Sequence, residues 1–84
     1  MVKKAVTVQC EKGLEARPIA MLVQKASQFT SKVYIEFGSK KINAKSIMGM
    51  MSLSVGNGDE VVIVAEGTDE VAAVDEIETY LKAQ

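Results

Sequence analysis

Residues 60–66, EVVIVAE, form the most apolar strand-length segment of the chain. An apolar run of this length between two glutamates predicts the central strand of a sheet. Residues 2–9 and 32–37 alternate apolar and polar side chains, which is the period of a half-buried strand. A Gly-Ser turn at 38–39 lets residues 40–43 pair back on the preceding strand as a hairpin. Further strands are therefore available on either side of 60–66.

The other periodic segments repeat every three to four residues, as amphipathic helices do. Residues 16–27 carry one such stripe, with Pro18 in the first turn, where no backbone donor is lost. Residues 47–53 predict a short helix. Residues 69–82 predict a longer one, and its expected buried stripe is Val71, Val74, Ile77 and Leu81.

The resulting order of elements is β-α-β-β-α-β-α. Hairpins, split crossovers and amphipathic helices together predict an α+β fold. We expect one antiparallel sheet with the helices on one face. The length of 84 residues corresponds to one small domain.

Composition excludes several classes of function. A net charge of −1 gives no basic surplus, so we expect no direct contact with nucleic acid. No apolar run reaches the length of a membrane span, and the N-terminal segment lacks the apolar core of a secretory signal. The single cysteine, Cys10, permits no internal disulfide, which fits a cytoplasmic protein.

The chain contains no histidine. This excludes general acid–base catalysis by histidine, phosphohistidine chemistry and imidazole metal ligands. With one cysteine, a structural zinc site is excluded as well. These exclusions limit the kinds of catalysis and of metal site that the chain could support.

Ser46 precedes the short helix and has the position of its N-cap. A capping hydroxyl of this kind stabilises a helix by about 1 kcal/mol. The same hydroxyl is a candidate phosphorylation site, because a phosphate would add about −1.5 to −2 charges beside the open amides of the helix. The residues alone leave both interpretations open.

The short helix after this serine is apolar on more than one side. Met50 and Leu53 lie three residues apart and can face the core together. Because a surface helix buries one stripe, some of Ile47, Met48 and Met51 should stay exposed. Either the helix is buried more deeply than is usual for a surface helix, or it carries an adaptable surface for a partner, to which methionine is well suited.

Residues 13–18, GLEARP, join a loop to the first long helix. Amides at a helix N-terminus attract anions, and Arg17 would add a full charge with a bidentate fork. Glu15 has the place of a carboxylate that stabilises its own helix by about 0.3–1 kcal/mol. No base, nucleophile or second acid lies nearby in the sequence, so the segment predicts no catalysis.

Two motifs of the chain resemble the HPr family, the small phosphocarriers of the bacterial sugar phosphotransferase system. Residues 13–18 are similar to the family's phosphocarrier loop with one change. Residues 43–53, NAKSIMGMMSL, are similar to its regulatory serine segment. The resemblance extends over essentially the whole chain. It implies a single HPr-like domain, 1–84, folded as an open-faced β-sandwich with four antiparallel strands and three helices.

The change falls on the phosphocarrier histidine, whose position is Glu15 here. A carboxylate cannot form the phosphoramidate, so histidine phosphotransfer should be absent, although Arg17, which helps to hold the phosphate in the family, remains. The Crh branch of the family (catabolite repression HPr-like) also lacks this histidine. Crh has glutamine there, so Glu15 departs from that pattern too, while residues 29–31 and 43–46 look more like Crh than like HPr.

The resemblance to Crh implies a regulatory role in carbon catabolite repression, for a protein that is not an enzyme and uses neither a metal nor a cofactor. HPr kinase/phosphorylase would phosphorylate Ser46, and the phosphoserine form would act as corepressor of the transcription regulator CcpA. By the same resemblance Ile47, Met48 and Met51 would form the apolar part of the interface, with Lys45 beside the phosphate. We expect a monomer or a weak homodimer, since an edge strand beside a short hinge could permit strand exchange.

Two alternatives stay open at this point. The chain could be a phosphocarrier HPr in which the histidine at position 15 was replaced by glutamate, so that its natural function is phosphotransfer. It could also be a constitutive interaction module in which Glu15, near Arg17, partly imitates a phosphorylated histidine. That imitation would be imperfect, because a carboxylate carries one negative charge and a phosphate nearly two.

Overall fold

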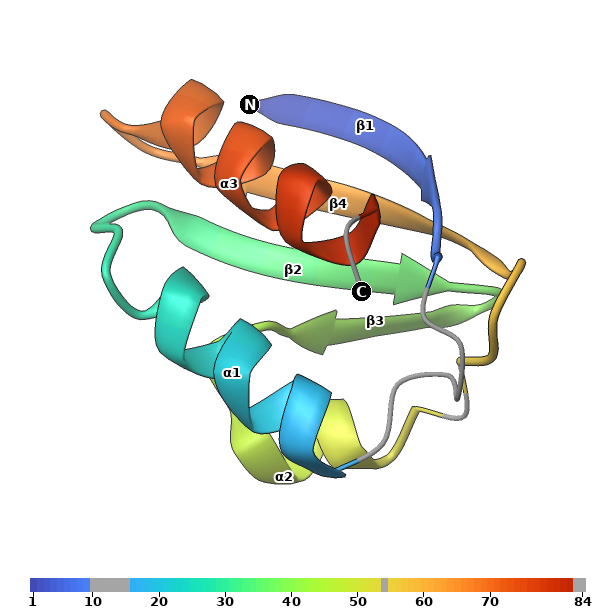
Figure 1. Ribbon diagram of the computed structural model, residues 1–84. Coiled ribbons are helices and arrows are strands. Elements are labelled where there is room, and N and C mark those ends of the chain that lie inside the picture. Colours follow the sequence, from blue (N-terminus) through green and yellow to red (C-terminus); the bar gives the residue numbers. More distant parts are fainter. Residues whose placement is uncertain (10–15, 54, 83–84) are drawn as a thin grey trace.

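The computed structural model describes residues 1–9, 16–53 and 55–82, with the backbone alone of residues 16 and 17. Within these ranges the chain forms four strands and three helices in the predicted order, shown in Figure 1. The elements are β1 (Val2–Thr7), α1 (Ala16–Ala26), β2 (Lys32–Phe37), β3 (Lys40–Asn43), α2 (Ile47–Met51), β4 (Glu60–Glu66) and α3 (Glu70–Lys82).

The strands form one antiparallel sheet in the order β1-β4-β2-β3. The prediction that 60–66 is central is confirmed, because β4 pairs with β1 on one side and with β2 on the other. Val61, Ile63 and Ala65 of β4 face the helices and belong to the core. Val64 alternates to the open face, yet it is also buried, opposite Tyr34 of β2. The continuous apolar run of β4 therefore contributes buried side chains to both faces of the sheet.

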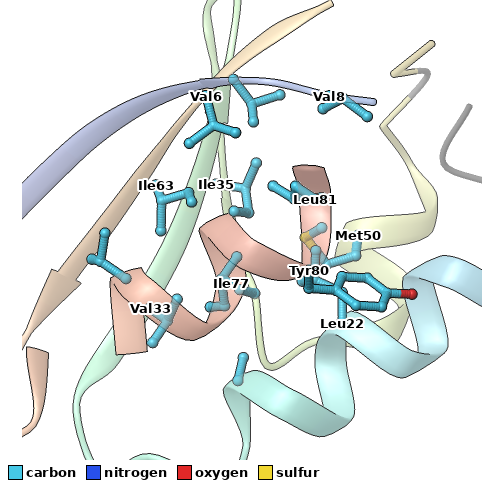
Figure 2. Packing of buried hydrophobic residues seen from close by; sticks show 14 of the residues in the cluster. Val6, Val8, Leu22, Val33, Ile35, Met50, Ile63, Ile77, Tyr80 and Leu81 are labelled. Carbon is cyan, nitrogen blue, oxygen red and sulfur yellow. The ribbon is translucent and has the colours of Figure 1, made fainter. Parts of the chain in front are cut away.

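The helices lie on one side of this sheet, as expected (Figure 1). α3 packs against β1 and β4, while α1 packs against both α3 and α2. α2 lies beyond the short edge strand β3 and also contacts it. The core between the layers includes Leu22, Ile35, Met50, Ile63, Ile77 and Leu81, all fully buried (Figure 2).

Tyr80 ties the two long helices together. Its ring packs in the core (Figure 2). Its hydroxyl donates a hydrogen bond of 2.9 Å to the backbone carbonyl of Pro18. Pro18 is the third residue of α1, so the prediction that it lies in the first turn is confirmed. The beginning of α1 is thereby held against the last turns of α3.

The prediction that Val71 belongs to the core is wrong. Val71 is 60% exposed, and the buried positions of α3 begin at Ala73. Six residues at 3.6 per turn place Val71 about 120° around the helix axis from Ile77, which lies at the centre of the buried stripe. The predicted limits of the shorter elements also move: the first strand ends at Thr7 and the short helix at Met51.

A polar corner connects the end of α1 to the beginning of α3. The Asp69 carboxylate accepts hydrogen bonds from the amides of Thr30 and Ser31, both at 2.9 Å, and from the Ser31 hydroxyl. These bonds, that of the Ser31 hydroxyl above all, lower the pKa of Asp69 to about 2. Gly67 lies directly against Ser31, and a Cβ built on it would be 2.6 Å from the Ser31 Oγ. The corner therefore requires glycine at this position.

Candidate functional site

Ser46 caps α2, as the sequence predicts. Its backbone is extended, with φ −104° and ψ 111°, and its Oγ accepts a hydrogen bond of 3.2 Å from the amide of Gly49. The approach depends on the glycine, since a Cβ there would be 3.2 Å from the Ser46 Oγ and 3.0 Å from Ile42 Cγ2. Ser46 is nevertheless exposed. The residue that caps α2 therefore lies at the protein surface.

Lys45 is engaged with a neighbouring loop. Its Nζ donates a hydrogen bond of 2.6 Å to the backbone carbonyl of Phe29, just beyond the end of α1. Its amide donates to the Asn43 side chain at 2.8 Å, and its side chain is half-buried. The sequence interpretation did not include this structural role, because the two partners of the Nζ bond are separated by 16 residues.

The apolar residues of α2 divide into a buried and an exposed group. Met50 is fully buried, and Leu53 just after the helix is buried as well. Met48 is 83% exposed, Met51 53% and Ile47 45%. The prediction that some of these three side chains stay exposed is confirmed for all of them. Their exposure leaves an apolar surface directly beside Ser46.

This surface continues onto α1. An open pocket of about 390 Å³ lies between α1 and α2, and its lining consists of Ala20, Met21, Val23, Gln24, Ser27 and Ile47. Met21 is itself 45% exposed. We call Met21, Ile47, Met48 and Met51 the α1–α2 patch. Sequence reasoning missed Met21, although its place off the buried stripe of α1 was a signal that it would face outward.

The predicted site at Glu15 and Arg17 lies outside what the structure describes. Glu15 falls in the segment 10–15, and for Arg17 only the backbone is described, as the second residue of α1. Of the site residues predicted from the sequence, the structure places Ser46, Ile47, Met48 and Met51 together on one surface. The roles of Glu15 and Arg17 stay predictions.

The charged side chains with altered pKa values belong to the framework. Glu78 of α3 is paired with Lys4 at 2.8 Å and with Lys82 at 3.1 Å, and these hydrogen bonds and charges lower its pKa. Among the described residues, no three histidine, cysteine, aspartate or glutamate side chains are grouped to hold a metal ion. Over the same ranges, no helix has both the length and the apolar character needed to cross a membrane.

Comparison with known families identifies the fold. The family model described as "PTS HPr component phosphorylation site" matches residues 2–83. The chain belongs to the HPr family. It is 48% identical to the HPr-like protein Crh of Bacillus subtilis strain 168, over 84 residues that cover 100% of this chain and 99% of that protein. It is 45% identical to the HPr-like protein Crh of Halalkalibacterium halodurans, with 100% of both chains covered.

Solved structures agree with this assignment. The crystal structure of the phosphocarrier protein HPr of Bacillus anthracis superposes with a TM-score of 0.92 at 44% identity, covering 95% of each chain. The crystal structure of Bacillus subtilis Crh, described as a dimer with a swapping domain, gives a TM-score of 0.80 at 48% identity, covering 100% of this chain and 97% of that chain. The open-faced sandwich with one antiparallel sheet is thus the HPr fold.

Proposed function

We propose that this chain, as a single HPr-like domain over 1–84, is a regulatory, non-catalytic protein of carbon catabolite repression. HPr kinase/phosphorylase phosphorylates Ser46, and the phosphorylated protein acts as corepressor of a CcpA-type transcription regulator. The observation that carries the proposal is the exposed residue Ser46 immediately beside the exposed side chains of Ile47, Met48 and Met51. These proposed partners place the function in the cytoplasm.

Phosphorylation would change the charge of the surface while the fold stays as it is. The phosphate adds about −1.5 to −2 charges and three acceptor oxygens. The Gly49 amide that now donates to the Ser46 Oγ can donate to the modified side chain instead. Since Lys45 is bound to the Phe29 carbonyl, most of the new charge remains available to cationic groups of the partner. The apolar side chains of the α1–α2 patch then pack beside that ionic contact.

The change at position 15 supports a regulatory role over phosphotransfer. The chain has no histidine to carry a phosphoramidate, and Glu15 stands where the family's phosphocarrier histidine is expected. In this proposal Arg17 contributes to partner binding rather than to phosphate transfer. The site needs neither a cofactor nor a metal.

We further propose that the protein associates at most as a weak homodimer. β1 is an edge strand that pairs only with β4 among the described strands. A strand held by one neighbour can exchange between two copies when its connection permits it. The Bacillus subtilis relative, described as a dimer with a swapping domain, supports this expectation.

A phosphorylation assay tests the proposal. The protein and its Ser46→Ala variant are each incubated with HPr kinase/phosphorylase and ATP, and the affinity for a CcpA-type regulator is then measured. We expect one phosphate on the unmodified chain, none on Ser46→Ala, and tighter regulator binding only after phosphorylation. Equal labelling of the two proteins, or unchanged affinity, would contradict the proposal.

The alternative function is that of a phosphocarrier HPr in which position 15 was altered to glutamate. The TM-score of 0.92 against an HPr phosphocarrier is consistent with this alternative. A Glu15→His variant separates the two. If enzyme I and phosphoenolpyruvate load that variant and it passes the phosphate to a sugar permease component, the remaining residues still form a phosphocarrier site. Failure of loading would support loss of that role throughout the chain.

A further inference from the structure

The methionines of this protein differ sharply in exposure. The chain has five. Met48 is 83% exposed, Met51 53% and Met21 45%, whereas Met50, on the same short helix, is fully buried. Met1 is 65% exposed but lies at the start of β1, at the opposite end of the molecule from α2 (Figure 1).

The three exposed internal methionines lie on two helices that contact each other, α1 and α2. Met48 and Met51 lie three residues apart on α2, so they are neighbours on the helix surface. Met21 of α1 and Ile47 of α2 both line the pocket of about 390 Å³. Three of the four side chains of the α1–α2 patch are therefore thioethers, and a change in their chemistry alters most of its members.

A thioether reacts with a peroxide when the peroxide can reach its sulfur. The O–O bond breaks, one oxygen forms a bond to sulfur, and the other leaves as water or an alcohol. Sulfur is oxidised and the peroxide is reduced. The resulting sulfoxide is polar and chiral, and methionine sulfoxide reductases reverse the change. A buried sulfur reacts only after the surrounding structure opens.

We propose that Met48, Met51 and Met21 form a peroxide-sensitive modification site, and that their oxidation removes the apolar character of the α1–α2 patch. The consequence for partner binding rests on the function proposed above. Met50 is spared because the core covers it, so the fold persists while the surface changes. Binding is weakened because each sulfoxide brings a polar oxygen to an apolar contact. A docked partner should in turn protect these sulfurs, since the coupling is reciprocal.

Time-resolved oxidation tests the selectivity. The folded protein is treated with hydrogen peroxide, and each methionine is followed by peptide mass mapping. Met48, Met51 and Met21 should oxidise, with Met48 fastest, and Met50 should lag behind Met48 by about tenfold or more, because its exposure requires local unfolding. Far-UV circular dichroism should stay unchanged meanwhile. Similar rates at Met50 and Met48 would overturn the proposal.

A matched variant tests the consequence. The triple substitution Met21→Leu, Met48→Leu, Met51→Leu keeps a similar apolar volume and has no sulfur to oxidise on the patch. Peroxide should shorten retention of the unsubstituted protein on a hydrophobic-interaction column and weaken binding of its Ser46-phosphorylated form to the regulator by about tenfold or more. For the triple variant, retention and regulator affinity are each compared before and after treatment, and peroxide should change neither value, although Met1 is oxidised in both proteins.

The two readouts separate failure of this proposal from failure of the proposed function. If the untreated phosphorylated protein does not bind the regulator, the proposed function is wrong, while mass mapping and column retention still decide whether the patch is a selective oxidation site. Equal loss of retention in the two proteins, or no loss in the unsubstituted one, would refute the proposed oxidation site. Retention lost together with unchanged regulator affinity would refute the link to binding.

Discussion

Replacing Gly67 by alanine tests how the corner between α1 and α3 is built. A Cβ at this position would be 2.6 Å from the Ser31 Oγ, 2.7 Å from its Cα and 2.9 Å from its Cβ. All three atoms belong to Ser31, a buried residue whose amide and hydroxyl are bound to Asp69, so they cannot move aside without breaking those bonds. The glycine also has a φ of +154°, which side-chain-bearing residues rarely adopt.

The two effects give the expected magnitude. Forcing an L residue into a sparsely populated backbone region costs about 1–3 kcal/mol. Inserting a carbon into a packed site costs about 1–3 kcal/mol more. The free energy of unfolding should therefore fall by about 2–6 kcal/mol, which for a domain of this size corresponds to a Tm lower by roughly 8–48 °C.

Urea unfolding followed by circular dichroism measures the difference, with Gly56→Ala as the matched control. A Cβ on Gly56 meets only Asp59 Oδ2 at 3.5 Å, an ordinary contact, so that variant should stay within about 0.5 kcal/mol of the unsubstituted protein. If Gly67→Ala and Gly56→Ala unfold at the same urea concentration, the reasoning about the corner is wrong.

Three further outcomes follow from the described contacts. Folding lowers the pKa of Asp69 from 3.8 to about 2, so the contribution of this carboxylate to the free energy of unfolding should be complete above pH 4 and lost as the pH falls toward 2. Ser31→Ala lacks the hydroxyl that lowers this pKa most, so the free energy of unfolding of that variant should depend less on pH between 4 and 2, as measured by acid unfolding. Lys45→Met should unfold about 1 kcal/mol more easily in urea, because the bond to the loop carbonyl is lost, and an unchanged midpoint would contradict this. Met50→Ala should lower the free energy of unfolding by about 2–5 kcal/mol and Met48→Ala by less than about 0.5 kcal/mol, as measured by thermal unfolding, and equal effects would contradict the assigned burial.

Local sequence patterns were sufficient to predict the order of the secondary-structure elements. The order of seven elements and the central place of β4 follow from periodicity, because alternation and helical stripes record which face of each segment is buried. Ser46 as an N-cap was also predictable, since capping depends on a residue and the next helical turn. The error at Val71 arose at the first turn of a helix, where an apolar side chain adjoins the stripe without belonging to it.

The sequence by itself determined the secondary structure, the absence of histidine chemistry and the apolar excess around the short helix. Only the tertiary structure decided that Met21 of α1 and Ile47 of α2 line one pocket, and that Lys45 binds the Phe29 carbonyl. It also showed that Ser31 meets Asp69, which lies 38 residues away. The physical reason is range: periodicity and capping act within a few residues, whereas a shared surface depends on how separate elements pack onto one sheet.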